Sequence, residues 1–331
     1  MIVREQFTVR PCQPGDYPAM AALANAAHRA VGDERLVTVD DLRREFESPG
    51  FNAAEGSFIL EAQGQMIGFA EMDFDTGIHV IWADGSIHPD YWGRGIGTEL
   101  VHLTEARARE WVERADLPPD QPIAIQRHTI DLNHAAIRLF EAEGYQYIRT
   151  FYQMRMELDQ PVDAPPLPSG IVLRPFDKAR DAHAVYQTHM DTFADHWGFE
   201  PQTFEMWTHN ILNRPNNDYS LWLVAWDGDE IAGICLNRPY GVADPDMGWV
   251  WELGVRRRWR KHGLGSALLG HSLALMRQRG YRRAGLGVDA ASLTNAVALY
   301  ERAGMHVHLR LVVYRKMLRG VFPEDAAPSA H

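Results

Sequence analysis

Hydrophobic and polar residues follow a pattern that occurs twice along the chain. Apolar runs of strand length flank a short turn at residues 58–72 and again at 222–236, around Gly64 and Gly228. Two such runs that enclose a turn with glycine are typical of a β-hairpin. We therefore expect an antiparallel hairpin in each half of the chain.

A second recurring pattern has helical spacing. Leu268, Leu269, Leu273 and Met276 fall on one face of a helix, and Gly280 is placed to end it. The corresponding segment of the first half behaves alike. Each half therefore mixes strands and helices, which predicts an α/β (α+β) fold with a mixed sheet flanked by helices.

The order of these segments indicates a duplication. Residues 159–170 contain four prolines and no apolar periodicity, which predicts a linker. On either side of it we expect two homologous domains, at 7–158 and 171–318, followed by a disordered tail at 319–331. The matched segments are 7–20 with 171–185, 58–72 with 222–236, 86–100 with 254–268, and 135–145 with 296–305.

Composition and charge argue against several classes of protein. The 331 residues are 46% hydrophobic, enough for about two ordinary cores. No stretch approaches the roughly 20 apolar residues that span a bilayer, and the N-terminus lacks a signal-peptide core. Cys12 and Cys235 are too far apart to indicate a disulfide framework or a metal site. We expect a cytoplasmic protein without metal or membrane, and the net charge of −11 argues against nucleic-acid binding.

One loop is basic in this acidic chain. Residues 260–265 read RKHGLG, after three consecutive arginines and a strand-like run, and before the predicted helix. Its two glycines allow backbone N–H groups to approach an anion, which the helix N-terminus behind them also favours. The alternative is a tight turn with a solvated basic rim. Because the first half has the same loop, with Gly93, Gly95 and Gly97, we favour a diphosphate-binding site.

The pattern Arg260-x-x-Gly263-x-Gly265, between a strand and a helix, resembles the acyl-CoA signature of the GCN5-related N-acetyltransferase (GNAT) family. The later segment VALYERAGM (297–305) resembles the second landmark of that family. Both landmarks occur in both halves, so the resemblance is to a tandem, two-domain GNAT protein. It implies a twisted mixed sheet in each domain, splayed between its fourth and fifth strands.

The resemblance also implies acetyl-CoA as the acyl donor. Its pantetheine arm would lie along the fourth strand, and its diphosphate on the amides of the glycine loop. The residues so assigned are Leu253, Val255, Arg260, Lys261, His262, Gly263, Leu264, Gly265, Ser266 and Asn295 in the second half, and Ile87, Trp92, Gly93, Arg94, Gly95, Gly97, Thr98 and Asn133 in the first.

Two residues of the second half are candidates for acid–base chemistry. Glu252, between bulky apolar residues, is a candidate general base, because poor solvation would raise its pKa. Tyr300 occupies the position where the family carries the tyrosine that protonates the CoA sulfur. The alternatives are an exposed Glu252 paired with an arginine and a Tyr300 that only packs in the core.

The first half departs from this pair. Through the repeat, Glu252 corresponds to Asp84 and Tyr300 to Phe140, whose ring cannot donate a proton. Trp92 stands in place of Arg260. At another position it is the second half that departs from the family pattern. The first half has the family's asparagine there, as Asn133, whereas the second half has Leu293. We therefore expect chemistry in the second domain and either a CoA site or a remnant of one in the first.

The sequence says less about the substrate that accepts the acetyl group. The segment 189–207 contains aromatic residues and acids such as Asp191 and Asp195, which would suit an amine-bearing acceptor or would simply cap the core. The expected function is an acetyl-CoA-dependent N-acetyltransferase acting on a small-molecule or peptide amine. The alternative is a non-catalytic acyl-CoA-binding regulator. For assembly, we expect a monomer with an internal pseudo-dimer, or a homodimer.

Overall fold

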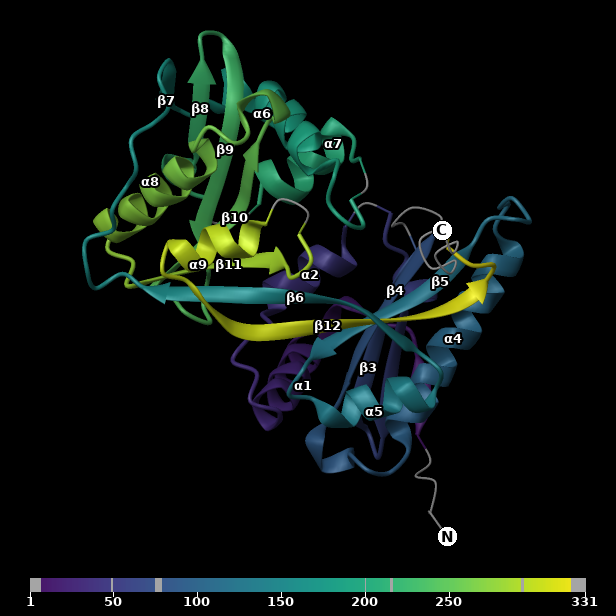
Figure 1. Cartoon of the computed structure of the whole chain (residues 1–331). Helices are drawn as coiled ribbons and strands as arrows, with labels where there is room; N and C mark the ends of the chain where they lie inside the picture. Colours follow the sequence, from purple (N-terminus) through teal and green to yellow (C-terminus); the bar gives the residue numbers. More distant parts are fainter. Residues whose placement is uncertain are drawn as a thin grey trace, which may run out of the picture. The chain divides into compact units, whose positions relative to one another are not determined.

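The computed structural model of the chain describes residues 7–48, 50–74, 79–199, 201–214, 217–292 and 295–322. It forms two compact units (Figure 1): unit 1 comprises residues up to Arg149 together with those from Leu311 onward, and unit 2 comprises Thr150–Arg310. The expected tail at 319–331 lies outside the described residues from 323 onward.

Unit 1 contains a mixed sheet with strand order β1-β2-β3-β4-β5-β12, to which β12 (His306–Arg319) contributes its residues from Leu311 onward. Its two faces are covered by different helices. Tyr17 and Met20 of α1 pack with Leu42 of α2 on one face, and Leu100 of α4 packs with Phe140 of α5 on the other. The elements are β1 (Thr8–Arg10), α1 (Tyr17–Ala30), α2 (Val39–Phe46), α3 (Ala53–Gly56), β2 (Ser57–Ala62), β3 (Gln65–Asp73), β4 (Val80–Ile87), α4 (Ile96–Arg114), β5 (Ile123–Ile130) and α5 (His134–Ala142).

Unit 2 repeats this plan with strand order β6-β11-β10-β9-β8-β7. Val185 of α6 and Trp207 of α7 pack on one face, and Leu268 of α8 and Tyr300 of α9 on the other. The elements are β6 (Gln146–Glu157), β7 (Ile171–Pro175), α6 (Lys178–Phe193), α7 (Phe204–Trp207), β8 (Leu223–Asp227), β9 (Glu230–Pro239), β10 (Met247–Val255), α8 (Leu264–Gln278), β11 (Arg283–Asp289) and α9 (Ala296–Arg302). Strand β12 begins in unit 2, at His306, and its residues from Leu311 onward belong to unit 1.

The local predictions from the sequence are confirmed. The hairpins β2–β3 and β8–β9 are antiparallel. Helix α8 ends at Gln278, and Gly280 after it has a φ of +91°, the left-handed conformation expected of a glycine at a helix C-terminus. Helix α6 begins at Lys178, and the side chain of its N-cap Asp177 accepts a hydrogen bond from the backbone N–H of Arg180.

Each sheet opens between its two central parallel strands. In unit 2, β10 pairs with β11 only from Met247 to Val250, although both strands continue beyond that point against other neighbours. In unit 1, β4 pairs with β5 only from Val80 to Trp82. Within the described residues, the later part of each fourth strand therefore has one backbone edge without a strand partner. This confirms the expected splayed sheet.

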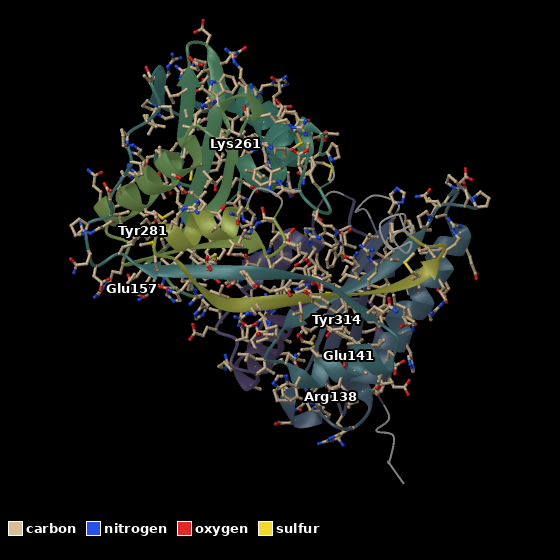
Figure 2. The ribbon with its side chains drawn as sticks, in the orientation of Figure 1. Arg138, Glu141, Glu157, Lys261, Tyr281 and Tyr314 are labelled. Atoms are coloured by element: carbon tan, nitrogen blue, oxygen red, sulfur yellow. The ribbon has the colours of Figure 1, made fainter. Side chains whose placement is uncertain are left out.

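The last strand of each half completes the sheet of the other unit. Strand β6, at the end of the first half, pairs with β11 over the whole length of β11, whereas β12 pairs with β5 from Leu311 onward. The hydroxyl of Tyr314 on β12 donates to a carboxylate oxygen of Glu141 in α5 at 3.2 Å (Figure 2). The compact units consequently differ from the expected division at 7–158 and 171–318.

The proline-rich stretch at 159–170 contains no helix or strand. It lies against α8, where Pro165 and the neighbouring backbone come so close to Gly270 that a Cβ there would meet Pro165 Cδ at 2.7 Å. Among the described helices, none is long and apolar enough to cross a membrane.

Candidate active site

Strand β10 has a bulge at the point where it leaves β11. Its register against β9 shifts between Val250, opposite Asn237, and Glu252, opposite Leu236. Trp251 is the extra residue, and such a residue is left out of the ladder and bends the strand. Leu253 and Val255, both predicted to bind acetyl-CoA, continue the strand along its open edge. An extended ligand chain can add to an edge of this kind.

The glycine loop follows directly. After a 3-10 turn at Arg257–Trp259, Lys261 has a φ of +66° and Gly263 a φ of +82°. Gly263 is the N-cap of α8, and a Cβ there would meet no atom within 4 Å. The exposed end of α8 thus presents its first backbone N–H groups above an open surface, which suits a diphosphate. Leu264 is buried and anchors the helix in the core.

Unit 1 contains a loop of the same conformation. A 3-10 turn at Pro89–Tyr91 is followed by Gly93 with a φ of +75° and Gly95 with a φ of +81°, and Gly95 is the N-cap of α4. Gly93 corresponds to Lys261, so the second half holds a lysine in a conformation that disfavours a side chain. Gly97 and Thr98, like Gly265 and Ser266 of α8, lie in the first helical turn.

Arg260, predicted to bind acetyl-CoA, also makes a structural contact within the loop. Its Nε donates to the carbonyl of Val255 at 2.9 Å, and this bond ties the loop to the end of β10. In unit 1, Trp92 Nε1 makes the equivalent bond to the carbonyl of Ile87 at 2.8 Å. The tryptophan therefore preserves the conformation of the loop, although it removes a positive charge.

Acidic residues at the end of α6 pair with this basic loop. Asp195 accepts hydrogen bonds from Arg257 and, at 3.2 Å, from Arg260. Asp191 forms an ion pair with Arg256 at 3.0 Å. Asp191 and Asp195, which the sequence suggested as acids for an amine-bearing acceptor, are therefore paired with arginines of the loop. Lys261, labelled in Figure 2, and His262 are exposed at the loop tip.

Glu252 lies in a recessed part of unit 2, with 15% of its side chain exposed. Burial raises its pKa to about 8, although the nearby positive charge of Arg238 acts in the opposite direction. The second of the two readings, an exposed glutamate paired with an arginine, does not fit this environment. A carboxyl group of this kind can take up a proton near neutral pH.

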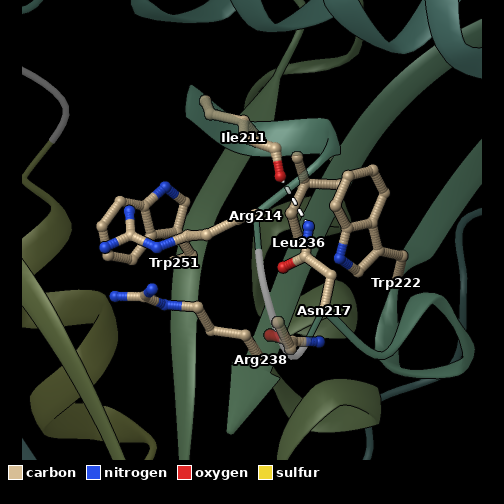
Figure 3. A pocket seen from close by; sticks show the side chains of 8 residues that line it. Ile211, Arg214, Asn217, Trp222, Leu236, Arg238 and Trp251 are labelled. Carbon is tan, nitrogen blue, oxygen red and sulfur yellow. Dashed lines mark hydrogen bonds between the residues drawn. The ribbon is translucent and has the colours of Figure 1, made fainter. Parts of the chain in front are cut away.

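The guanidinium groups of Arg214 and Arg238 both lie against the indole ring of Trp251, the residue before Glu252 (Figure 3). The guanidinium carbon of Arg238 lies 3.6 Å from the ring centroid of Trp251, and that of Arg214 lies 4.7 Å from it. A small pocket borders these three side chains, lined also by Ile211, Asn217 and Leu236. Such contacts hold the bulged tryptophan beside the candidate base.

The sequence did not identify His189 as a buried neighbour of Glu252, or Trp207 as the hydrogen-bond partner of His189. His189 of α6 has its Nε2 at 3.6 Å from Glu252 Oε2, and its Nδ1 accepts a hydrogen bond from Trp207 Nε1 at 2.8 Å. His189 is 63 positions from Glu252 in the chain, and no local spacing connects them. Only the packing of α6 and α7 on the sheet brings the three residues together.

Tyr300 lies on the other face of the sheet, in the cluster of α8 and α9 that includes Cys235 and Val250. Burial raises its pKa well above the ordinary range for tyrosine, and the neighbouring Cys235 and Glu252 act in the same direction. Its phenol therefore stays protonated at any physiological pH, as a proton donor must. Core packing remains the alternative role.

The counterparts in unit 1 have other surroundings. Asp84 pairs with His128 at 3.0 Å; burial would raise its pKa, but the pairing prevails and lowers it. The β3–β4 register shows no shift at this position. Phe140 packs against Tyr145 and Tyr314. At Asp84, unit 1 therefore has neither a strand bulge nor a carboxyl group with a raised pKa.

The two asparagines cap helices. Asn133 is the N-cap of α5 and accepts a hydrogen bond from the backbone N–H of Ala136 at 3.2 Å. Asn295 is the N-cap of α9 with a φ of +55° and no such bond. Leu293 lies outside the described residues. In the part of the chain that the structure describes, no group of His, Cys, Asp and Glu side chains is arranged to hold a metal ion.

Comparison with known proteins defines the class. A model of the acetyltransferase (GNAT) family matches residues 19–145 and again 182–305, so the chain belongs to this family and carries two of its domains. The crystal structure of a GCN5-related N-acetyltransferase from Sphaerobacter thermophilus is 33% identical, with a TM-score of 0.78, over 95% of this chain and 97% of that one.

Named relatives are also acetyltransferases. The chain is 31% identical to a mycothiol acetyltransferase from Geodermatophilus obscurus, over 92% of this chain and 95% of the relative. A tandem GNAT protein from the clavulanic acid biosynthesis pathway shares the fold, with a TM-score of 0.70 at 15% identity, over 96% of this chain and all of that one. The chain is an N-acetyltransferase with tandem GNAT domains.

Proposed function

We propose that the protein transfers the acetyl group of acetyl-CoA to the primary amine of a small molecule or peptide, and that unit 2 carries out the chemistry. The observation that supports this choice is the surrounding of Glu252: a buried carboxyl group with a raised pKa, next to a strand bulge at the mouth of the sheet opening. The corresponding Asp84 is paired and has a lowered pKa.

The roles of Glu252 and Tyr300 follow from the protons that must move during acetyl transfer. The acceptor ammonium loses a proton to Glu252, the amine nitrogen forms a bond to the thioester carbon, and the carbon–sulfur bond breaks. The departing thiolate takes a proton from Tyr300, and the nitrogen releases its second proton to solvent. Backbone groups of β10 and the N-terminus of α8 hold the pantetheine and the diphosphate. The matching loop of unit 1, at Gly93–Gly95, is either a second CoA site or a remnant of one.

A screen tests this function directly. The protein is incubated with acetyl-CoA and a panel of primary amines, including the acceptor of the mycothiol acetyltransferases, and release of free CoA is measured. We expect amine-dependent release. Tight acetyl-CoA binding without release for any amine would instead favour the non-catalytic regulator.

The diphosphate site can be tested at its glycine. Gly263→Val is expected to weaken acetyl-CoA binding by tens-fold, because a branched side chain is strained at a φ of +82° and crowds the N–H groups that face the diphosphate. Calorimetry measures the affinity and circular dichroism verifies the fold. Gly280→Val is the matched control, since Gly280 also has a positive φ, of +91°, and open space around an added Cβ, but follows the opposite end of α8. Unchanged affinity in Gly263→Val would place the donor elsewhere.

A further inference from the structure

The indole of Trp207 fixes the state of the His189 ring. Trp207 is fully buried and His189 is 6% exposed. An indole N–H can only donate, so the 2.8 Å bond to His189 makes Nδ1 the acceptor. Nδ1 therefore carries no proton, and a neutral ring must carry its proton on Nε2. The chemistry of the partner, rather than an assigned hydrogen position, determines this tautomer.

The protonated nitrogen faces the candidate base. His189 Nε2 lies 3.6 Å from Glu252 Oε2, which is longer than a hydrogen bond but close enough for the N–H dipole to orient the carboxylate. Burial lowers the pKa of His189 to about 4, and His196 acts in the same direction. Around neutral pH the two side chains are therefore a neutral imidazole and a carboxyl group, and not an ion pair.

The neutral state matters for the strength of the base. An imidazolium at this distance would stabilise the carboxylate and depress its pKa. Among the described residues, the other charged or titratable groups that act on the pKa values of this pair are Arg238 of β9, on Glu252, and His196 after α6, on His189. Tyr300 lies on the opposite face of the sheet, and Glu252 acts on its pKa. Arg238 already lowers the pKa of Glu252. A second cation would weaken the base further.

We propose that Trp207 and His189 are positioning residues, which hold a neutral N–H against Glu252 so that this carboxylate is oriented and remains strongly basic. This inference rests on the proposed role of Glu252. Neither residue needs to touch the acceptor or acetyl-CoA. Both act through the glutamate, and their effect should appear in the pH dependence of the reaction.

The tautomer can be measured without catalysis. Nitrogen-15 NMR of the free protein, with His189 assigned by its disappearance in His189→Gln, is expected to show protonated Nε2, unprotonated Nδ1, and no titration above about pH 5. In Trp207→Phe the Nδ1 loses the donor that favours the neutral ring, so we expect the pKa of His189 to rise, although burial and His196 continue to lower it. A wild-type His189 that titrates near 6.5 would overturn the inference, whatever the variants do.

The pH profile of kcat/KM tests the consequence. Trp207→Phe is expected to shift the rising limb by at least about one unit to lower pH, and to lower the plateau several-fold because the base is weaker. The double variant Trp207→Phe/His189→Gln lacks the titrating ring. The rising limb of its pH profile should therefore return to the wild-type position. Trp222→Phe, a similar truncation in the same hydrophobic cluster, should leave the limb in place.

These outcomes separate the two proposals. If Glu252→Gln leaves the reaction and its profile unchanged, the role of Glu252 as base fails. If Glu252→Gln removes the limb while Trp207→Phe leaves its position unchanged, only the positioning role fails. An equal shift in Trp222→Phe would identify a general loss of packing and would also contradict the positioning role.

Discussion

Tyr300→Phe is expected to lower kcat about 10²- to 10⁴-fold, while the affinity for acetyl-CoA changes little. The substitution removes one hydroxyl and keeps the ring that packs between α9 and the sheet, so the fold should persist. It also reproduces the residue that unit 1 already has at the matching position, Phe140. Steady-state kinetics with the amine found in the screen, together with calorimetry for acetyl-CoA, measures both quantities.

Tyr281→Phe is a matched control for this variant. Tyr281 packs against the same cluster as Tyr300, but it follows the C-terminal end of α8, whereas the glycine loop lies at the N-terminal end. A helix of 15 residues separates the two ends by roughly 22 Å. The control should therefore retain its turnover. Full activity in Tyr300→Phe would leave this tyrosine with a packing role only.

Glu252→Gln is the second large expected effect, a loss of about 10²-fold in kcat/KM. The glutamate must be ionised to accept a proton, and its pKa is raised to about 8, so the wild-type rate should rise with pH and level off above that value. The glutamine variant should lack this limb. Because the pKa of Tyr300 is raised far beyond this range, no falling limb from the acid is expected at the upper end.

Asp84→Asn in unit 1 provides the comparison. Its carboxylate is paired with His128, and its pKa is lowered, so it is poorly suited to act as a base near neutral pH. We expect turnover to remain almost unchanged. The reverse pattern, an inactive Asp84→Asn variant beside active Glu252→Gln and Tyr300→Phe variants, would place the working site in the N-terminal half.

The features that the sequence predicted well depend on neighbours close in the chain. The hairpins around Gly64 and Gly228 need only apolar runs and a turn, and the glycine loop is contiguous with its strand and helix. The raised pKa of Glu252 was also foreseeable, because bulky apolar residues surround it in the strand itself.

Other features depend on contacts that no local pattern encodes. The side chains of Arg260 and Trp92 make equivalent bonds to a strand carbonyl, and the sequence, which shows only an arginine replaced by a tryptophan, does not reveal this shared contact. The acids Asp191 and Asp195 suggested a binding wall, but the arginines that neutralise them lie more than 60 residues away in the chain. Likewise, similarity between the halves cannot reveal which sheet their final strands join.

The exchanged strands have a consequence for synthesis on the ribosome. Chains emerge N-terminus first, and a tandem protein can usually fold its first domain before the second is made. Here β5 of unit 1 receives its neighbour only when Leu311–Arg319 has been synthesised, close to the end of the chain. Until then a nascent unit 1 exposes the edge of β5, which is a template for pairing with other chains. The first unit to be translated is thus among the last to be completed.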